Sequence, residues 1–112
     1  MKDQPTPVEL VLQLHGEFRQ TLEPLRVTPL QAGVLLVLQR HAEAKVSDGA
    51  AALRVSLPTM SEVVKDLVRK RWVTRHRSVT DARVVHLRLS RLGLVLTRKI
   101  EHHTRRVKTG LA

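Results

Sequence analysis

Partway along this chain the spacing of apolar residues changes from a helical repeat to an alternating one, and this change constrains the fold most strongly. Between residues 57 and 70, apolar residues recur about every third or fourth position, which predicts a helix with one buried face. Beyond Trp72 they recur at every second position, as in Val85, Leu87 and Leu89, which predicts β-strands. The 112-residue chain is therefore expected to form one mainly α domain with a small β-hairpin.

The hairpin is expected to have strands at residues 73–77 and 84–89, with a tip around residues 80–83. Neither Asn-Gly nor Asp-Gly occurs between the two strands, although these pairs favour the tightest hairpin turns. We therefore expect a longer and mobile tip.

Hydroxyl residues mark the expected starts of the helices, because their side chains accept hydrogen bonds from the first free backbone N–H groups. Proline follows closely at several of these sites, where its fixed φ suits the first helical turn. The predicted N-caps are Thr6, Thr28, Ser47, Ser56 and Ser90, which place helices at about 7–24, 29–41, 48–53, 57–70 and 91–107. The short connection 54–56 makes the third and fourth of these a helix-turn-helix unit.

The first predicted helix has two possible explanations for its apolar pattern. Val8, Val11, Phe18 and Leu22 follow the spacing of a coiled-coil seam, with His15 in the gap. An ordinary amphipathic helix packed on its own core would show the same pattern. Further leucines at positions 10, 12 and 14 lie partly off this seam, and a subunit interface on a second face would explain them.

The net positive charge lies in the second half of the chain. Residues 1–60 contain six Lys or Arg and six Asp or Glu, whereas residues 61–112 contain fourteen and four, so the net charge of +10 lies there. Such a one-sided field is typical of proteins that bind polyanions, above all nucleic acids. The alternatives are a solvated basic surface, an acidic lipid surface or an acidic protein partner.

Composition argues against several other classes of protein. Without cysteine the chain has no disulfide, thiolate zinc site or thiol redox centre. Phe18 and Trp72 are the only aromatic residues, too few to stack RNA bases on surface rings. No apolar run reaches membrane-spanning length and no signal peptide is evident, so we expect a cytoplasmic protein without membrane contact. Neither catalytic motifs nor ligand-spaced histidines occur, so no enzyme, metal site or other cofactor is expected.

The predicted helix at 57–70 has two distinct faces. Its inner face consists of Met60, Val63, Val64, Leu67 and Val68, and its outer face of Pro58, Thr59, Ser61, Glu62, Lys65 and Arg69. Small polar residues near its N-terminus suit close approach to a groove, because long side chains would hold the helix away from base edges. A helix of this kind, followed by an arginine-rich hairpin, has the layout of a DNA-binding element.

Six short motifs between residues 28 and 96 together resemble a known family. They are Leu30-Gln31 with Val34-Leu35, Ala50 with Leu53-Arg54-Val55-Ser56, Thr59-Met60-Ser61 with Val64 and Leu67, Val73-Thr74-Arg75, Asp81-Ala82-Arg83, and Leu89-Ser90-Arg91-Leu92-Gly93. The acid-x-arginine followed by leucine-hydroxyl-x-x-glycine is the most specific part. In this order and at these spacings, the motifs resemble the winged helix-turn-helix of the MarR family of transcriptional regulators.

The resemblance implies a homodimeric regulator of transcription, expected to be a repressor, that binds double-stranded DNA. Its recognition helices would enter successive major grooves, and an arginine on each wing would reach the backbone or the minor groove. DNA-contacting roles are thereby implied for Ser56, Pro58, Thr59, Ser61, Glu62, Lys65, Arg69, Arg75, Arg77, Asp81 and Arg83. Arg83 resembles the wing-tip arginine of the family and Asp81 the acid that steadies it. A small-molecule effector is a further possibility, because family members often bind one.

The same resemblance implies a division of the chain into three parts. Residues 1–27 would form an N-terminal dimerisation helix, residues 28–90 the winged helix-turn-helix, and residues 91–112 a C-terminal dimerisation helix. The sequence ends at Ala112, so we expect the first and last helices to form the dimer interface without a further helix.

The sequence departs from the family pattern at two places within the winged helix-turn-helix. Gly49 stands where the family usually has leucine, which should weaken the short helix by roughly 1 kcal/mol and remove a core contact. Arg71-Trp72 replaces a glycine-apolar pair, so the helix at 57–70 is expected to lack a left-handed cap.

A winged-helix module that binds another protein, without sequence-specific DNA binding, is the alternative interpretation. The arginine pattern favours DNA, because a protein-binding wing need not carry Arg75, Arg77, Arg83 and Arg88 together.

Overall fold

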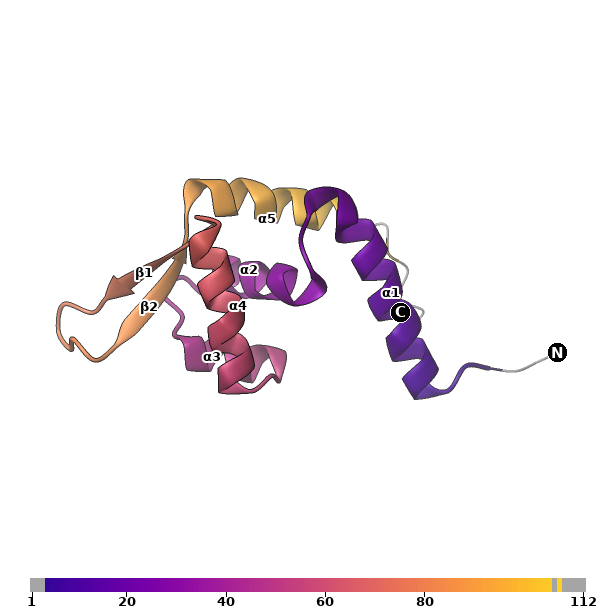
Figure 1. Ribbon diagram of the computed structural model, residues 1–112, viewed down its shortest axis with the longest axis horizontal. Coiled ribbons are helices and arrows are strands. Elements are labelled where there is room, and N and C mark those ends of the chain that lie inside the picture. Colours follow the sequence, from indigo (N-terminus) through magenta and orange to yellow (C-terminus); the bar gives the residue numbers. More distant parts are fainter. Residues whose placement is uncertain (1–3, 106, 108–112) are drawn as a thin grey trace.

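Five α-helices, one 3₁₀ turn and one antiparallel hairpin form the part of the chain that the structure describes, residues 4–105 and 107 of a computed structural model (Figure 1). The elements are α1 (Pro7–Leu22), η1 (Glu23–Leu25), α2 (Pro29–Arg40), α3 (Val46–Leu53), α4 (Leu57–Arg69), β1 (Val73–Arg77), β2 (Val85–Leu89) and α5 (Arg91–Thr104). The predicted fold class, mainly α with a small β-hairpin, is confirmed. Figure 1 shows α1 extending away from the body, with α5 running along one side of the body towards it.

Four of the five predicted N-caps are confirmed. Hydroxyl oxygens accept the hydrogen bond of the backbone N–H three residues later, at 3.2 Å for Thr6, 3.1 Å for Thr28, 3.2 Å for Ser56 and 3.0 Å for Ser90. The cap predicted at Ser47 is wrong, because α3 begins at Val46 and Ser47 lies inside its first turn. The backbone N–H of Lys45 donates to Asp48 Oδ2 at 2.9 Å, and this bond fixes the earlier start.

Several predicted boundaries also shift by one to three residues, including the ends of α2 at Arg40 and α4 at Arg69. The α-helix of α1 ends at Leu22, and Pro24 lies in the 3₁₀ turn that follows. The return strand begins at Val85 instead of Val84, and α5 ends at Thr104. These shifts move no element out of place.

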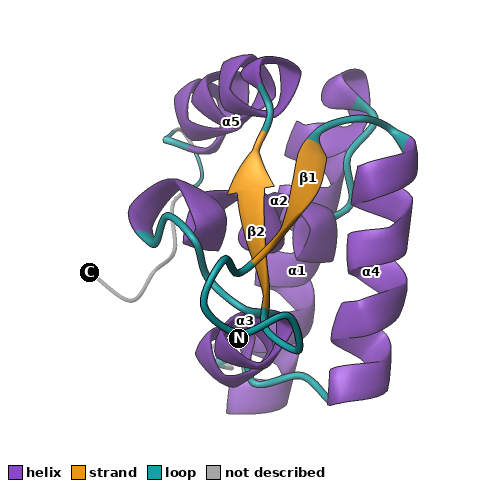
Figure 2. Cartoon of the chain, turned by 90° about the vertical axis from the view of Figure 1, so that its left-hand side faces the viewer, coloured by secondary structure: helices purple, strands orange, loops and turns teal. Residues whose placement is uncertain are grey.

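The hairpin pairs β1 with β2 in one register, from Val73 opposite Leu89 to Arg77 opposite Val85. The backbone N–H of Leu87 also donates to the carbonyl of Ala44 at 2.8 Å, so the segment before α3 adds a one-residue bridge to the hairpin. Figure 2 shows the two strands with α4 beside β1. The expected long tip is confirmed, since residues 78–84 separate the strands, while its mobility stays a prediction.

Aliphatic side chains from the helices and both strands meet in one core, as the low aromatic content requires. Its members are at most 5% exposed and include Leu22, Val27, Val34, Leu35, Leu38, Met60, Val64, Leu67, Val73, Leu87 and Ile100.

Gly49 of α3 packs against Met60 of α4 within this core. A Cβ added at Gly49 would lie 2.2 Å from Met60 Cε, so the methionine occupies the space that a larger residue at position 49 would need. Both residues are buried. The predicted loss of a core contact at Gly49 is therefore wrong, because the neighbouring helix supplies that contact.

Two arginines occupy the left-handed positions where helices commonly end in glycine. Arg71 follows α4 with φ 63°, and Arg54 follows α3 with φ 55°. After α4 the backbone N–H of Trp72 donates to the Leu67 carbonyl at 3.0 Å, and that of Arg71 donates to the Val68 carbonyl at 2.9 Å. The expectation that α4 lacks a left-handed cap is wrong, because these two hydrogen bonds hold a non-glycine residue in that conformation.

The C-terminal end of α4 is joined to α5 through four residues, Arg71, Trp72, Ser90 and Gly93, here called the α4–α5 junction. The Ser90 hydroxyl donates to the Arg71 carbonyl at 2.6 Å, and the Ser90 backbone N–H donates to the Trp72 carbonyl at 3.0 Å. A Cβ at Gly93 would lie 2.0 Å from the Trp72 carbonyl oxygen, so only glycine fits there. The leucine-hydroxyl-x-x-glycine motif thus has a packing role.

Candidate nucleic-acid interface

The outer face of α4 presents polar side chains, as its sequence predicts. Pro58, Thr59, Glu62 and Lys65 are exposed, whereas Met60, Val64 and Leu67 on the inner face are at most 1% exposed. Ser61 is half-buried, between the two faces. The first turns of α4 therefore offer a short, uneven polar surface of the kind that can approach base edges.

Ser56 serves α4 in two ways at its N-terminus. Its oxygen accepts from the backbone N–H of Thr59 at 3.2 Å, and its hydroxyl donates to Thr59 Oγ1 at 2.9 Å. The Ser56 side chain thus orients the Thr59 side chain as well as capping the helix.

The two cations on α4 are each paired with a carboxylate one turn away. Lys65 Nζ lies 3.5 Å from Glu62 Oε1, and Arg69 Nη1 lies 2.9 Å from Asp66 Oδ1. The Glu62 side chain is 75% exposed. Such exposed pairs contribute little free energy, so either cation can exchange its carboxylate for a phosphate at low cost.

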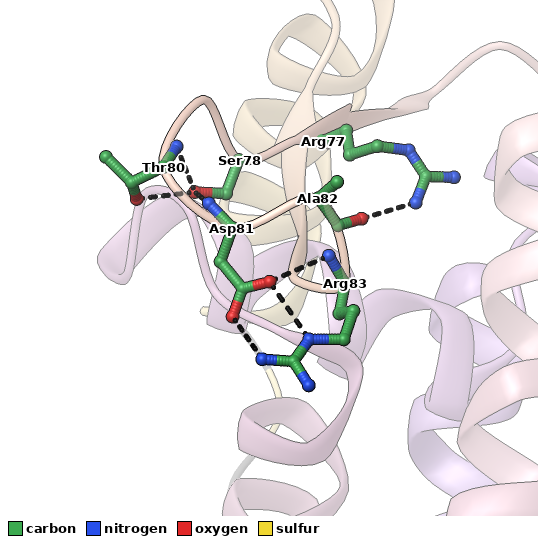
Figure 3. Close-up of polar contacts among 6 residues, drawn as sticks. All are labelled: Arg77, Ser78, Thr80, Asp81, Ala82 and Arg83. Carbon is green, nitrogen blue, oxygen red and sulfur yellow. Dashed lines mark hydrogen bonds and ion pairs between the residues drawn. The ribbon is translucent and has the colours of Figure 1, made fainter.

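The wing tip is organised around Asp81 and Arg83 (Figure 3). Asp81 Oδ1 accepts from the backbone N–H of Arg83 at 3.0 Å and from Arg83 Nε at 3.2 Å. The Ser78 hydroxyl oxygen accepts from the backbone N–H groups of Thr80 and Asp81, each at 3.3 Å. The Arg83 side chain is 91% exposed, so the Asp81 carboxylate holds an accessible guanidinium at the tip.

The Arg83 backbone N–H, and secondly its guanidinium, hold the pKa of the Asp81 carboxyl below the usual 3.8 of aspartate. Asp81 is therefore ionised at neutral pH and keeps its hold on Arg83. Arg77 reaches the same tip from β1, where its Nη1 donates to the Ala82 carbonyl.

The arginines of the hairpin do not form one set, because the strand register divides them between its faces. Arg75 lies opposite Leu87 and Arg77 opposite Val85, and directly opposed residues share a face. Arg88 points to the other face, where it pairs with Glu43. The register therefore separates Arg88 from Arg75 and Arg77, and a DNA contact by any of the three stays a prediction.

Glu43 is a residue that the sequence did not single out. It bridges Arg88 and His86, with 3.6 Å between Glu43 Oε2 and His86 Nδ1. It lies in the loop before α3, 45 positions from Arg88, so no local spacing signals the pair.

Two further features of the described residues concern membrane-spanning helices and metal sites. No helix among them is long and apolar enough to cross a membrane. Within the same residues, no group of three or more His, Cys, Asp or Glu side chains is arranged to hold a metal ion.

Comparisons with known proteins agree on one family. The model of the MarR family matches residues 27–84. An uncharacterized HTH-type transcriptional regulator, YpoP of Bacillus subtilis, is 28% identical over 97 residues, which cover 87% of this chain and 65% of YpoP. The HTH-type transcriptional repressor MdtR of Bacillus subtilis is 30% identical over 84 residues, which cover 75% of this chain and 54% of MdtR. The matches span less than two thirds of either relative.

Among solved structures, a MepR mutant from S. aureus bound to an oligodeoxyribonucleotide superposes with a TM-score of 0.77 at 25% identity. The superposition covers 91% of this chain and 75% of MepR. The family model covers the helix-turn-helix, most of the wing and the Asp81-Arg83 tip, and the superposition extends the likeness to most of the described fold. The chain belongs to the MarR family.

Proposed function

We propose that this chain is a transcriptional repressor of the cytoplasm that binds double-stranded DNA sequence-specifically as a homodimer. The outer face of α4 would enter the major groove, where Pro58, Thr59, Ser61 and Glu62 meet base edges. Lys65 and Arg69 would bind phosphates at its margins. Family membership, the repressor MdtR and the oligodeoxyribonucleotide bound by MepR support this proposal.

The observation that carries the proposal is the wing tip. An arginine that is 91% exposed, and whose Nε is held 3.2 Å from an ionised carboxylate, is oriented before any ligand arrives. Arginine suits the narrow minor groove, whose negative potential is enhanced. A protein-binding wing has no need of such a fixed and solvated cation, so the tip favours DNA over the alternative.

The apolar residues left exposed on α1 and α5 support the homodimer. Val8, Val11, Leu12 and Leu92 are each more than 60% exposed. Exposed apolar patches of this kind mark interaction surfaces. We assign dimerisation to residues 1–27 and 91–112 and DNA binding to residues 28–90, and a small-molecule effector stays a prediction.

Selection of bound duplexes from a random DNA pool tests the proposal. The expected result is a palindromic site whose half-sites lie about one helical turn apart, because two-fold symmetry in the protein requires it. Recovery of no enriched duplex would overturn sequence-specific binding and favour the protein-interaction module.

Arg83→Ala tests the wing separately. Affinity should fall on all duplexes, and the slope of log affinity against log salt should become shallower by about one. Arg88→Ala is the matched control, since Arg88 is paired with Glu43 on the other face of the hairpin. Equal affinities of the two variants for DNA would show that Arg83 makes no specific contribution to DNA binding.

A further inference from the structure

The turn between α3 and α4 carries an arginine, Arg54, outside the set of contacts proposed above. Arg54 is exposed and lies two residues before Ser56, the N-cap of α4. In Figure 1 this turn lies at the lower end of the body, where α4 begins. If the first turns of α4 occupy a major groove, the sugar-phosphate backbone that borders the groove passes close to this turn.

We infer that Arg54 binds a DNA phosphate and so extends the interface from α4 onto the helix-helix turn, an inference that rests on the proposed function. Guanidinium matches phosphate geometry with paired donors. Lys65, Arg69, Arg83 and Arg88 are each paired with a carboxylate. Arg54 takes part in no ion pair among the described residues, so it gives up no partner when it meets a phosphate.

The backbone of Arg54 makes an unusually clean test possible. Its φ of 55° is one that glycine adopts without strain, so Arg54→Gly removes the side chain without threatening the fold. The turn keeps its hydrogen bonds in the variant, because they are backbone bonds, from Val55 N–H to the Ala50 carbonyl at 3.0 Å and from Arg54 N–H to the Ala51 carbonyl at 3.3 Å.

Arg71 provides a matched control within the same molecule. It has the same left-handed backbone, with φ 63°, and it is also exposed. It lies beyond the opposite end of α4, whose 13 residues separate the two arginines by about 20 Å. Arg54→Gly and Arg71→Gly therefore remove the same charge and relieve the same kind of backbone strain. They differ only in the end of α4 at which the charge is lost.

The experiment measures binding of the wild-type chain, Arg54→Gly, Arg54→Lys and Arg71→Gly to two duplexes over a range of salt concentrations. One duplex is selected by the wild-type chain from a random pool, and the other is a scrambled duplex of the same composition. Melting temperatures of the glycine variants should equal that of the wild type or exceed it by a few degrees.

Arg54→Gly should weaken binding to both duplexes by roughly five- to tenfold and make the salt slope shallower by about one. Arg54→Lys should keep the slope, and Arg71→Gly should lose clearly less affinity. Equal affinities of the two glycine variants would overturn the inference, as would a loss on the selected duplex alone, which would indicate base recognition. If the wild type enriches no duplex, the proposed function has failed, and that result is distinct from a failure of Arg54 alone.

Discussion

The two ends of α4 have similar backbones and opposite surroundings. Each end adjoins a left-handed arginine, Arg54 before the helix and Arg71 after it, and each adjoins a serine N-cap, Ser56 and Ser90. Around the first end, polar side chains face solvent. The second end is enclosed in the α4–α5 junction, where Gly93 leaves no room for a Cβ. Helix α4 thus has one end fixed to the scaffold, so that its other end is held in a defined position.

The largest effect is expected at the junction, from Gly93→Ala. The new Cβ would lie 2.0 Å from the Trp72 carbonyl oxygen, and backbone atoms cannot move aside as a flexible side chain can. We expect a loss of about 3 kcal/mol in the free energy of unfolding, measured by urea denaturation. Gly16→Ala is the control, because nothing lies within 4 Å of a Cβ at that helical position, and it should stabilise the chain by about 0.5–1 kcal/mol. An unchanged unfolding midpoint in Gly93→Ala would contradict the close approach.

At the exposed end of α4, a substitution should change DNA preference and leave stability nearly unchanged. Glu62→Ala removes only an exposed side chain and a weak pair with Lys65, so stability should change by less than about 0.5 kcal/mol. The preference for one or two base pairs in each half-site should relax by about 1–2 kcal/mol, measured by repeating the duplex selection. Asp66→Ala removes the other carboxylate pair of α4 and should leave the selected sequence unchanged.

Replacing each of the two serine caps by alanine compares the two ends of α4 directly. Ser56→Ala removes the cap of α4 and should cost about 1 kcal/mol of unfolding free energy. Ser90→Ala removes the cap of α5 and also the hydrogen bond to the Arg71 carbonyl, so it should cost about 2 kcal/mol. Only Ser56→Ala should alter the selected DNA sequence, because Ser56 orients Thr59. Equal costs in denaturation would show that the bond to Arg71 contributes nothing.

The smallest effect concerns the protonation of Asp81. Its pKa is lowered in the folded chain by the Arg83 backbone N–H and guanidinium, so the tip contacts are complete above the usual pKa of 3.8 and are lost as pH falls through the lowered value. A carboxyl NMR titration should place the Asp81 midpoint below 3.8. Arg83→Ala should raise that midpoint, and a midpoint unchanged by this variant would show that the guanidinium adds nothing to the backbone bond.

Local signals explain what could be predicted from the sequence. Four N-caps, the change from helical to alternating spacing and the two faces of α4 depend on residues within a few positions of one another. The cap of α3 was misplaced although its signal is also local, because Asp48 reaches back three residues and outweighs the hydroxyl of Ser47.

Contacts between distant segments explain which features could not be predicted from the sequence. The Glu43–Arg88 pair and the Gly93–Trp72 approach depend on how the helices and the hairpin meet, which no spacing along the chain reveals. The left-handed conformation of Arg71 was missed for a related reason. Propensity favours glycine there, and the two backbone hydrogen bonds that follow α4 outweigh that preference.

The contact between Gly49 and Met60 has an evolutionary consequence. Because the flexible end of Met60 fills the space beside the glycine, a larger residue at position 49 requires the methionine side chain to move. Relatives with a leucine at the position of Gly49 should carry a shorter residue at that of Met60, and the two columns of an alignment should covary. Since Met60 lies on the inner face of α4, a substitution in α3 would then change how deeply α4 packs into the core.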